Sequence, residues 1–268
     1  MSAAADPGFA GRVAIVTGGG TGIGAAVARQ LRAKGARCVI NYAHSRDEAE
    51  ALAAELGEAV AVQADIVEDH ACQALAAAAR AAFGRIDFLV NNAGRTKFAN
   101  HEDLAALSAE DFLDIYRLNV VAAFQMVRAC EADLRASGAG AVVNVASVAG
   151  VFGIGSSVAY AASKGALLTM TQSLARALAP AVRVNAVAPG YVASGWFEKR
   201  LGAEGFARLN ARIAAATPMG IATSPDEVAA PIVHLLDPAA RAITGETLLI
   251  DAGAHLDVGL SRRPGREG

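Results

Sequence analysis

Short runs of β-branched and other apolar residues alternate along the chain with longer, alanine-rich stretches in which polar positions recur at a helical period. The short runs have the length and composition of strands. They predict strands at 12–17, 37–42, 59–63, 86–90, 141–146, 182–188 and 247–250. The longer stretches predict a helix that ends near residue 34 and further helices at 46–56, 68–83, 108–137, 158–178 and 225–236.

Local signals sharpen some of these boundaries. Ser108 and Asp111 have the spacing of a capping box at the start of the long helical region 108–137. Ser224 followed by Pro225 predicts an N-cap with proline at the first helical position. Gly84 predicts the end of the preceding helix.

Apolar strands that alternate with helices predict βαβ units, and hence a parallel sheet covered on both faces. The alternation runs from Arg12 to Asp251 without a linker-like stretch. We therefore expect one doubly wound α/β domain over 11–256, with a central parallel seven-stranded sheet and helices on both faces. Residues 1–10 form a short N-terminal extension in this interpretation, and 257–268 form a polar C-terminal tail.

Composition narrows the function classes. The 268 residues are 54% hydrophobic and 19% charged, with a net charge of −2, so the chain should fold and has no basic excess for nucleic acid or an anionic membrane surface. No apolar run reaches ~18 residues, and no leader pattern begins the chain, which favours a cytoplasmic protein that does not span a membrane. Cys38, Cys72 and Cys130 lie far apart, which predicts core positions and neither a disulfide framework nor a metal site.

A glycine-rich segment, TGGGTGIG at 17–24, follows the first predicted strand and opens a helix. Glycines allow the backbone to turn tightly and to approach a pyrophosphate, while the helix N-terminus offers free N–H groups. Gly18, Gly22 and Gly24 give G-x-x-x-G-x-G, and no P-loop lysine follows. The segment therefore points to a bound dinucleotide, although a plain strand–helix connection has a similar composition.

Polar residues follow other predicted strands at the same edge of the sheet. The sequence NNAG at 91–94 follows the fourth predicted strand. It either contributes to the ligand site or forms an ordinary turn. Asp65 follows the third strand and can accept a hydrogen bond from an adenine amino group or cap the next helix.

Ser147 follows the fifth strand, and Tyr160 and Lys164 stand four residues apart on the next predicted helix. That spacing places a phenol and an ammonium on one helical face, unless both are ordinary surface residues. A nearby cation is expected to lower the pKa of the tyrosine and so make it a proton donor and acceptor near neutral pH. A serine hydroxyl can hold and polarise the same substrate oxygen.

Taken together, these motifs resemble the short-chain dehydrogenase/reductase family, whose fold is a Rossmann-type domain. The resemblance covers about 11–253 and rests on TGGGTGIG, Asp65, NNAG, Asn119, Ser147, YAASK at 160–164 and Pro189-Gly190, in family order. It implies that Tyr160 is the acid/base, that Lys164 lowers its pKa and holds the nicotinamide ribose, that Ser147 orients the substrate carbonyl and that Asn119 holds a proton relay. The cofactor contacts that it implies, besides Tyr160 and Lys164, are Gly18, Gly20, Thr21, Gly22, Ile23, Gly24, Tyr42, Ser45, Arg46, Asp65, Ile66, Asn91, Ala93, Gly94, Pro189, Gly190, Val192 and Ser194.

The choice of nicotinamide cofactor depends on the end of the second strand. An acidic residue there would bind the ribose 2′-hydroxyl and disfavour a 2′-phosphate. This chain has none, and Ser45 and Arg46 follow instead, so NADP(H) is favoured. Thr21 stands where NADP-dependent relatives often carry a basic residue, so NAD(H) stays open, and Arg46 also suits a solvated first helical turn.

The family resemblance implies an NAD(P)-dependent interconversion of a carbonyl and an alcohol. Reduction of a 3-oxoacyl thioester or similar carbonyl by NADPH is favoured, a sugar or polyol dehydrogenase is the alternative, and a dinucleotide-binding regulatory protein without turnover is a third reading. The tyrosine–lysine spacing differs from that of the enoyl-reducing members, which disfavours reduction of a carbon–carbon double bond. Family members assemble as homotetramers or homodimers, here through 109–137 and 158–178.

The segment 191–216 is expected to cover the substrate, as such a segment does in the family. Apolar residues predict a mainly apolar pocket, or else ordinary packing: Val151, Phe152, Ile154, Trp196 and Phe197. Arg95 and Lys97 follow NNAG and can attract an anionic group of the substrate or remain solvated.

Overall fold

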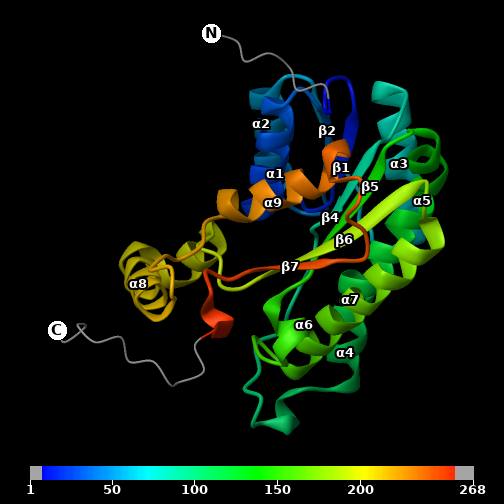
Figure 1. Ribbon diagram of the computed structural model, residues 1–268. Coiled ribbons are helices and arrows are strands. Elements are labelled where there is room, and N and C mark those ends of the chain that lie inside the picture. The colour runs from blue at the N-terminus through cyan, green and yellow to red at the C-terminus, as the bar shows by residue number, and fades with distance from the viewer. Residues whose placement is uncertain (1–7, 257–268) are drawn as a thin grey trace.

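A seven-stranded parallel sheet forms the middle layer of the computed structural model, which describes residues 8–256 (Figure 1). The strands are β1 (Val13–Val16), β2 (Arg37–Tyr42), β3 (Ala59–Gln63), β4 (Phe88–Asn91), β5 (Gly140–Val145), β6 (Val182–Pro189) and β7 (Thr247–Ile250). They pair in the order β3-β2-β1-β4-β5-β6-β7, and each neighbouring pair is parallel. The order reverses beside β1, which confirms the predicted doubly wound sheet and places a ligand crevice at the carboxyl ends of β1 and β4.

Helices cover both faces of the sheet (Figure 1). One layer contains α1 (Gly22–Ala33), α2 (Arg46–Leu56) and α9 (Pro225–Leu236), and the other contains α3 (Asp69–Phe83), α5 (Ala123–Ala136) and α7 (Val158–Leu178). Alternate residues of a strand serve the two layers: Ala14 and Val16 of β1 pack under α1, whereas Val13 and Ile15 pack under α3 and α5. A strand covered on both faces has no polar side, which is why the strands read as continuous apolar runs.

Helix starts follow the local signals of the sequence. The Ser108 hydroxyl and the Asp111 carboxylate form the predicted capping box at α4 (Ala109–Tyr116). Ser224 caps α9 and forms a second capping box with Glu227, with Pro225 at the first position. Each box satisfies backbone N–H groups that the first helical turn leaves without partners.

The prediction of a single continuous helix over 108–137 is wrong in the middle of that range. A π-helical turn, Arg117–Ala122, separates α4 from α5. The wider turn directs Asn119 into the protein, where its side chain is buried and its amide makes hydrogen bonds to two other segments. Such turns accumulate at functional sites because they redirect one side chain within a regular helix.

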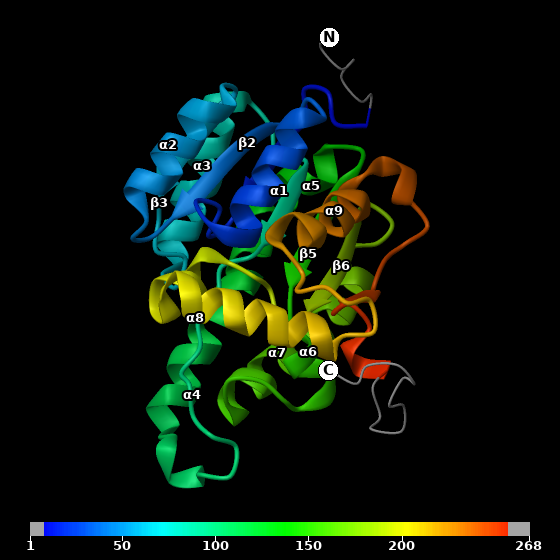
Figure 2. The same cartoon turned by 90° about the vertical axis from the view of Figure 1, so that its left-hand side faces the viewer.

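Two helices were not anticipated. The first is α6 (Val148–Phe152), a short helix that begins directly after Ser147. The second is α8 (Gly195–Ala216), which occupies most of the segment expected to cover the substrate and is interrupted at Gly202, where φ is +69° and ψ is 166°. Figure 2 shows α8 crossing the molecule below α1 and above α4.

The packed domain begins before the first strand. Phe9 is fully buried and its ring lies 5.6 Å from that of Phe88 on β4, so the core includes part of the expected N-terminal extension. Residues 1–7 and the predicted polar tail 257–268 lie outside the described residues. Within 8–256, no helix combines the length and the apolarity that a membrane crossing needs.

The three cysteines occupy the predicted core positions. Each thiol is free and buried, and burial raises the pKa of each to about 12. A thiol with such a pKa stays protonated and behaves as a small apolar side chain.

Candidate active site

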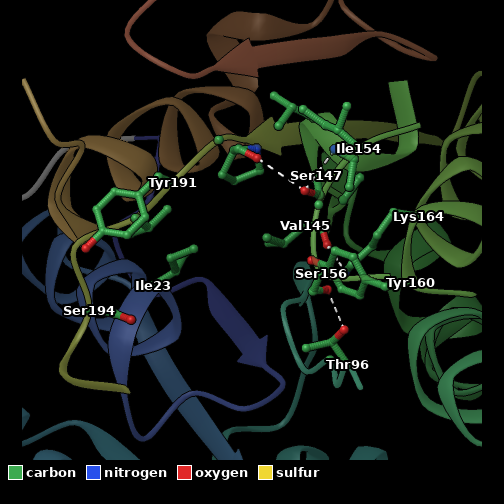
Figure 3. Close-up of a pocket in the computed structure, with 18 of the residues that line it drawn as sticks. Ile23, Thr96, Val145, Ser147, Ile154, Ser156, Tyr160, Lys164, Tyr191 and Ser194 are labelled. Atoms are coloured by element: carbon green, nitrogen blue, oxygen red, sulfur yellow. Dashed lines mark hydrogen bonds between the residues drawn. The ribbon is translucent and has the colours of Figure 1, made fainter. Parts of the chain in front are cut away.

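A cavity of about 720 Å³ opens at the carboxyl ends of the central strands (Figure 3). In Figure 3, Ser147, Tyr160 and Lys164 lie on one side of the hollow, and Ile23, Tyr191 and Ser194 lie on the other. The predicted site residues that line it are Ile23, Gly94, Ser147, Tyr160, Lys164, Pro189, Gly190, Val192 and Ser194. Residues from the loops after β1, β4, β5 and β6 thus meet in one site, as the strand order requires.

Tyr160 and Lys164 lie one turn apart on α7, with the lysine Nζ 5.7 Å from the centre of the tyrosine ring. The Lys164 ammonium is held in place because it donates a hydrogen bond of 2.7 Å to the carbonyl of Val145 at the end of β5. Ser147 caps α6 by accepting a hydrogen bond from the backbone of Ala149 at 3.1 Å. Its hydroxyl also donates to the Pro189 carbonyl at 3.4 Å and forms a hydrogen bond with Tyr160.

Burial controls the charges of this pair. It lowers the pKa of Lys164 to about 8, because a buried ammonium loses its hydration. It raises the pKa of Tyr160, and the hydrogen bond with Ser147 offsets only part of that rise. The lowered tyrosine pKa expected from the sequence is therefore wrong for this structure, in which desolvation raises the pKa of Tyr160. At neutral pH the phenol is protonated.

Asn119 stands behind the cavity wall rather than in its lining. Its Oδ1 accepts a hydrogen bond from the Arg95 N–H at 2.8 Å, and its Nδ2 donates to the Arg95 carbonyl at 3.0 Å and to Ser163 Oγ at 3.0 Å. A Cβ at Gly94 would lie 3.2 Å from Asn119 Oδ1 and 3.5 Å from Lys164 Nζ. Asn119 and Lys164 therefore both lie beside Gly94, whereas Ser147, Tyr160 and Lys164 line the cavity.

The glycine loop is locked to the loop after β4. The Asn92 amide donates to the carbonyls of Thr17 and Gly18 at 2.9 and 3.0 Å. A Cβ at Gly24 would meet the Gly18 carbonyl at 2.5 Å and the Asn92 amide at 2.7 Å, so only glycine fits there. Asn92 was not singled out from the sequence, although it belongs to the NNAG motif.

The N-terminus of α1 suits the pyrophosphate of a dinucleotide. Thr21 makes no side-chain cap and the first turn holds no acidic residue, so the N–H groups and the positive end of the helix dipole face no internal anion. A Cβ at Gly22 would meet nothing within 4 Å, which leaves open space beside the turn. Ile23 carries this turn into the cavity lining, so the residues present fit a nicotinamide dinucleotide.

Comparison with known proteins agrees with this geometry. A family model described as "Enoyl-(Acyl carrier protein) reductase" matches residues 18–255. The chain is 42% identical, over 91% of its length and 96% of the relative, to a protein described as ketoacyl reductase 2 of the granaticin polyketide synthase of Streptomyces violaceoruber. It is 36% identical, over 92% of its length and 98% of the relative, to L-rhamnose 1-dehydrogenase (NAD(P)(+)) of Azotobacter vinelandii.

A crystal structure described as a short-chain dehydrogenase/reductase from Burkholderia xenovorans superposes with a TM-score of 0.84 at 35% identity, covering 91% of this chain and 98% of the other. The chain belongs to the short-chain dehydrogenase/reductase family. It is accordingly an NAD(P)-dependent oxidoreductase that acts on CH–OH and C=O groups.

Other residues that the family resemblance assigned to the cofactor lie outside the cavity lining. Gly20 packs on Ala49 of α2, and Asn91 donates hydrogen bonds to Asn144 and to the carbonyl of Ala123 inside the core. The same holds for Gly18, Thr21, Gly22, Gly24, Tyr42, Ser45, Arg46, Asp65, Ile66 and Ala93. Their assignment to the cofactor stays a prediction.

The expected apolar pocket is present in part. Ile154 and Phe197 line the cavity. Val151 and Phe152 are exposed outside it, and the Phe152 ring stacks on His255 at 6.1 Å. The side chain of Trp196 lies outside the described residues.

The cavity also has polar walls that sequence reasoning missed. Thr96 Oγ1 and Ser156 Oγ form a hydrogen bond of 2.5 Å, and the Tyr191 hydroxyl donates to Asn210 Oδ1 at 2.7 Å (Figure 3 shows the first pair). Thr96 and Ser156 are 60 residues apart in the chain, and Tyr191 and Asn210 are 19 apart. No sequence motif predicts either pair. Only the fold brings them together.

Proposed function

We propose that this protein reduces a ketone or aldehyde to an alcohol with NADPH, and that Tyr160 delivers the proton. One observation carries the proposal: a half-buried, protonated phenol and a serine hydroxyl share a hydrogen bond on one wall of a cavity, and Ile23 of the glycine-rich segment lies on the opposite wall. A phenol that holds its proton at neutral pH is set for reduction, because it can donate to a carbonyl oxygen.

The residues divide the work as follows. The Ser147 hydroxyl and the Tyr160 hydroxyl hold the carbonyl oxygen of the substrate from one side and polarise it. A nicotinamide bound in this cavity would supply the hydride that the carbonyl carbon needs. Tyr160 gives its proton to the oxygen, which becomes the alcohol. The cationic Lys164, 5.7 Å from the ring, stabilises the phenolate left behind.

Asn119 acts as a support in this scheme. Its amide binds the Arg95 backbone on both sides and so holds the strip of chain that passes over Lys164. The Lys164 ammonium has a pKa of about 8, within reach of neutral pH, so it can pass a proton toward Tyr160 after each turnover. The resemblance to the family likewise implies that Asn119 and Lys164 take part in a proton relay.

The substrate class rests on the site and on the relatives together. Tyr160 and Lys164 are four residues apart, a spacing that favours carbonyl over enoyl reduction, although the matching family is described as an enoyl reductase. A ketoacyl compound is the favoured substrate because a relative at 42% identity is described as a ketoacyl reductase. A sugar is the second candidate, since another relative is L-rhamnose 1-dehydrogenase.

The segment 191–216 covers the substrate in this proposal. Tyr191 and Phe197 line the cavity with their rings 5.0 Å apart, so the start of α8 forms one wall. Arg200 lies 4.6 Å from the centre of the Phe98 ring, and Lys199 Nζ lies 3.4 Å from Glu48 Oε1. These two contacts tie α8 to α2 and to the segment after β4.

NADPH is favoured over NADH by the charge at the end of β2. Arg46 lies at the first position of α2, where its guanidinium donates to Gln63 Oε1 at 3.0 Å and lies 3.7 Å from Glu50 Oε1. Both contacts are exposed, so they cost little to exchange for a 2′-phosphate. Ser45 offers a hydroxyl beside it that makes no cap hydrogen bond.

Replacing Arg46 with alanine is expected to weaken NADPH binding about 10-fold and to leave NADH binding unchanged, because only NADPH carries the 2′-phosphate. Titrations followed by nicotinamide fluorescence measure both dissociation constants. Arg29→Ala is the matched control, since Arg29 is also exposed and paired, with Glu55. Equal losses for the two nucleotides in Arg46→Ala would contradict the assignment.

We also propose a homotetramer or homodimer built through 109–137 and 158–178. Large apolar side chains are exposed on these helices, namely Leu113, Val121, Phe124 and Val158. Phe124→Glu is expected to shift the molecular mass in sedimentation equilibrium toward the monomer, because a charge would be buried at the interface. Leu104→Glu, at a residue exposed outside both helices, is the control. An unchanged mass in Phe124→Glu would contradict this interface.

A further inference from the structure

The cavity has an uneven charge. Two cations line it, Lys164 and Arg95, and among the described lining residues there is no carboxylate. The Lys164 ammonium already has a partner, because it is buried and donates a hydrogen bond to the Val145 carbonyl. Arg95 is exposed, and within residues 8–256 its guanidinium forms no ion pair and no hydrogen bond. The cavity therefore presents an uncompensated positive charge to its contents.

The other cations near Arg95 already have partners within the protein. Lys97, the other cation after NNAG, donates to Asp111 Oδ2 at 2.7 Å, and this contact lowers the pKa of Asp111 to about 2. Arg200, on α8, packs over the Phe98 ring. Of the two residues that could attract an anion, the fold thus pairs Lys97 with the capping-box aspartate of α4 and leaves Arg95 in the cavity lining.

The position of Arg95 is also defined. Its N–H and its carbonyl are both bound by the Asn119 amide, at 2.8 and 3.0 Å. Its neighbour Gly94 lies over Lys164, so a Cβ there would be 3.5 Å from Nζ. The Arg95 side chain therefore starts from a fixed backbone position next to Gly94, and Gly94 lies beside the Lys164 ammonium.

We propose that Arg95 is a specificity-determining residue that binds an anionic group carried by the carbonyl substrate itself. The inference rests on the proposed function and deepens it: the preferred substrates are oxo acids or phosphorylated ketones rather than neutral ones. Planar guanidinium matches a carboxylate or a phosphate with two parallel hydrogen bonds, whereas the ester or the free alcohol offers only a weak acceptor. Such a group also fixes the carbonyl in front of Tyr160.

The test compares matched pairs of substrates. A graded series of linear oxo acids with increasing separation between ketone and carboxylate is assayed beside the methyl esters, and dihydroxyacetone phosphate beside dihydroxyacetone. Wild-type enzyme is expected to show a kcat/KM at least about 10-fold higher for one acid of the series, or for the phosphate, than for its neutral partner. The two arms separate a carboxylate from a phosphate as the natural group.

Variants then assign the preference. Arg95→Gln keeps length and hydrogen bonding without the charge, and it is expected to raise KM for the preferred anion about 10-fold, with KM for the neutral partner and the dissociation constant of NADPH unchanged. Lys97→Gln is the matched control and should keep the preference, because its cation is already paired. Added salt should raise KM for the anion and not for the ester.

Several results would overturn the inference. An equal kcat/KM for every anion and its neutral partner would do so, as would equal losses for both partners in Arg95→Gln. A loss of NADPH affinity in Arg95→Gln would assign the guanidinium to the dinucleotide phosphates instead.

Binding measured without turnover separates this inference from the proposed function. Calorimetric titration of the oxo acid into the NADP⁺-loaded protein reports the guanidinium contact even if the proposed reaction is wrong. Turnover of neutral esters without any anion preference would leave the proposed function standing and reject the role of Arg95. Binding of the acid without turnover of any ketone would reject the proposed function and leave the role of Arg95 standing.

Discussion

Tyr160→Phe is expected to lower the turnover of carbonyl reduction by at least ~10²-fold, the usual scale of general acid–base catalysis, and to leave NADPH binding unchanged. The substitution removes one hydroxyl and keeps the half-buried ring, so it deletes the proton donor without opening a cavity. Pre-steady-state rates of NADPH oxidation measure the chemical step, and fluorescence titration measures binding. Tyr191→Phe is the matched control, because Tyr191 lines the same cavity but its hydroxyl donates to Asn210. Its turnover should stay within a few-fold of the wild type.

The pH dependence of the wild type supplies a second readout for the same residue. Burial raises the pKa of Tyr160, so the phenol stays protonated through neutral pH. Reduction needs that proton and should be nearly independent of pH there, whereas alcohol oxidation needs the phenolate and should accelerate as pH rises. Tyr160→Phe should lose this acceleration. Near-normal turnover in the variant, or an oxidation rate that falls with rising pH, would reject Tyr160 as the acid/base.

The second large effect concerns the glycine loop. In Gly24→Ala the new Cβ would collide with the Gly18 carbonyl and the Asn92 amide, at 2.5 and 2.7 Å. Because these atoms form the clamp between the two cofactor-facing loops, relief of the clash must displace the turn that precedes α1. We expect NADPH affinity to fall by at least ~10-fold and the free energy of unfolding to fall by about 1–3 kcal/mol.

A stability loss alone would not show that the loop binds the dinucleotide. Gly138→Ala provides the comparison, since Gly138 has a φ of +73° and open space around it in the turn before β5. That variant is strained as well, and it should lose stability without losing NADPH affinity. Unchanged affinity in Gly24→Ala would contradict the pyrophosphate site.

Much of the fold follows from local pattern. Both faces of the sheet are covered, so each strand reads as an apolar run, and the predicted strands agree with β1–β7 to within about one residue at most ends. The capping boxes at Ser108 and Ser224 depend on residues three positions apart, which the sequence displays directly. The tyrosine–lysine pair is local in the same sense, since it spans a single helical turn.

The features that sequence reasoning missed depend on contacts between distant segments. The π-helical turn at Asn119 accompanies hydrogen bonds to Arg95, 24 residues away, and to Ser163, 44 residues away. The clamp formed by Asn92 joins loops that are 75 residues apart. No periodicity or spacing along the chain records such partners.

Electrostatics divides in the same way. The sequence by itself determined that a phenol and an ammonium share a helical face, and that two cations follow NNAG. Only the tertiary structure decided that burial raises the pKa of Tyr160, and that Lys97 is paired while Arg95 lines the cavity. The physical reason is that hydration and ion pairing depend on what surrounds a group in space, whereas secondary structure depends mainly on its neighbours in the chain.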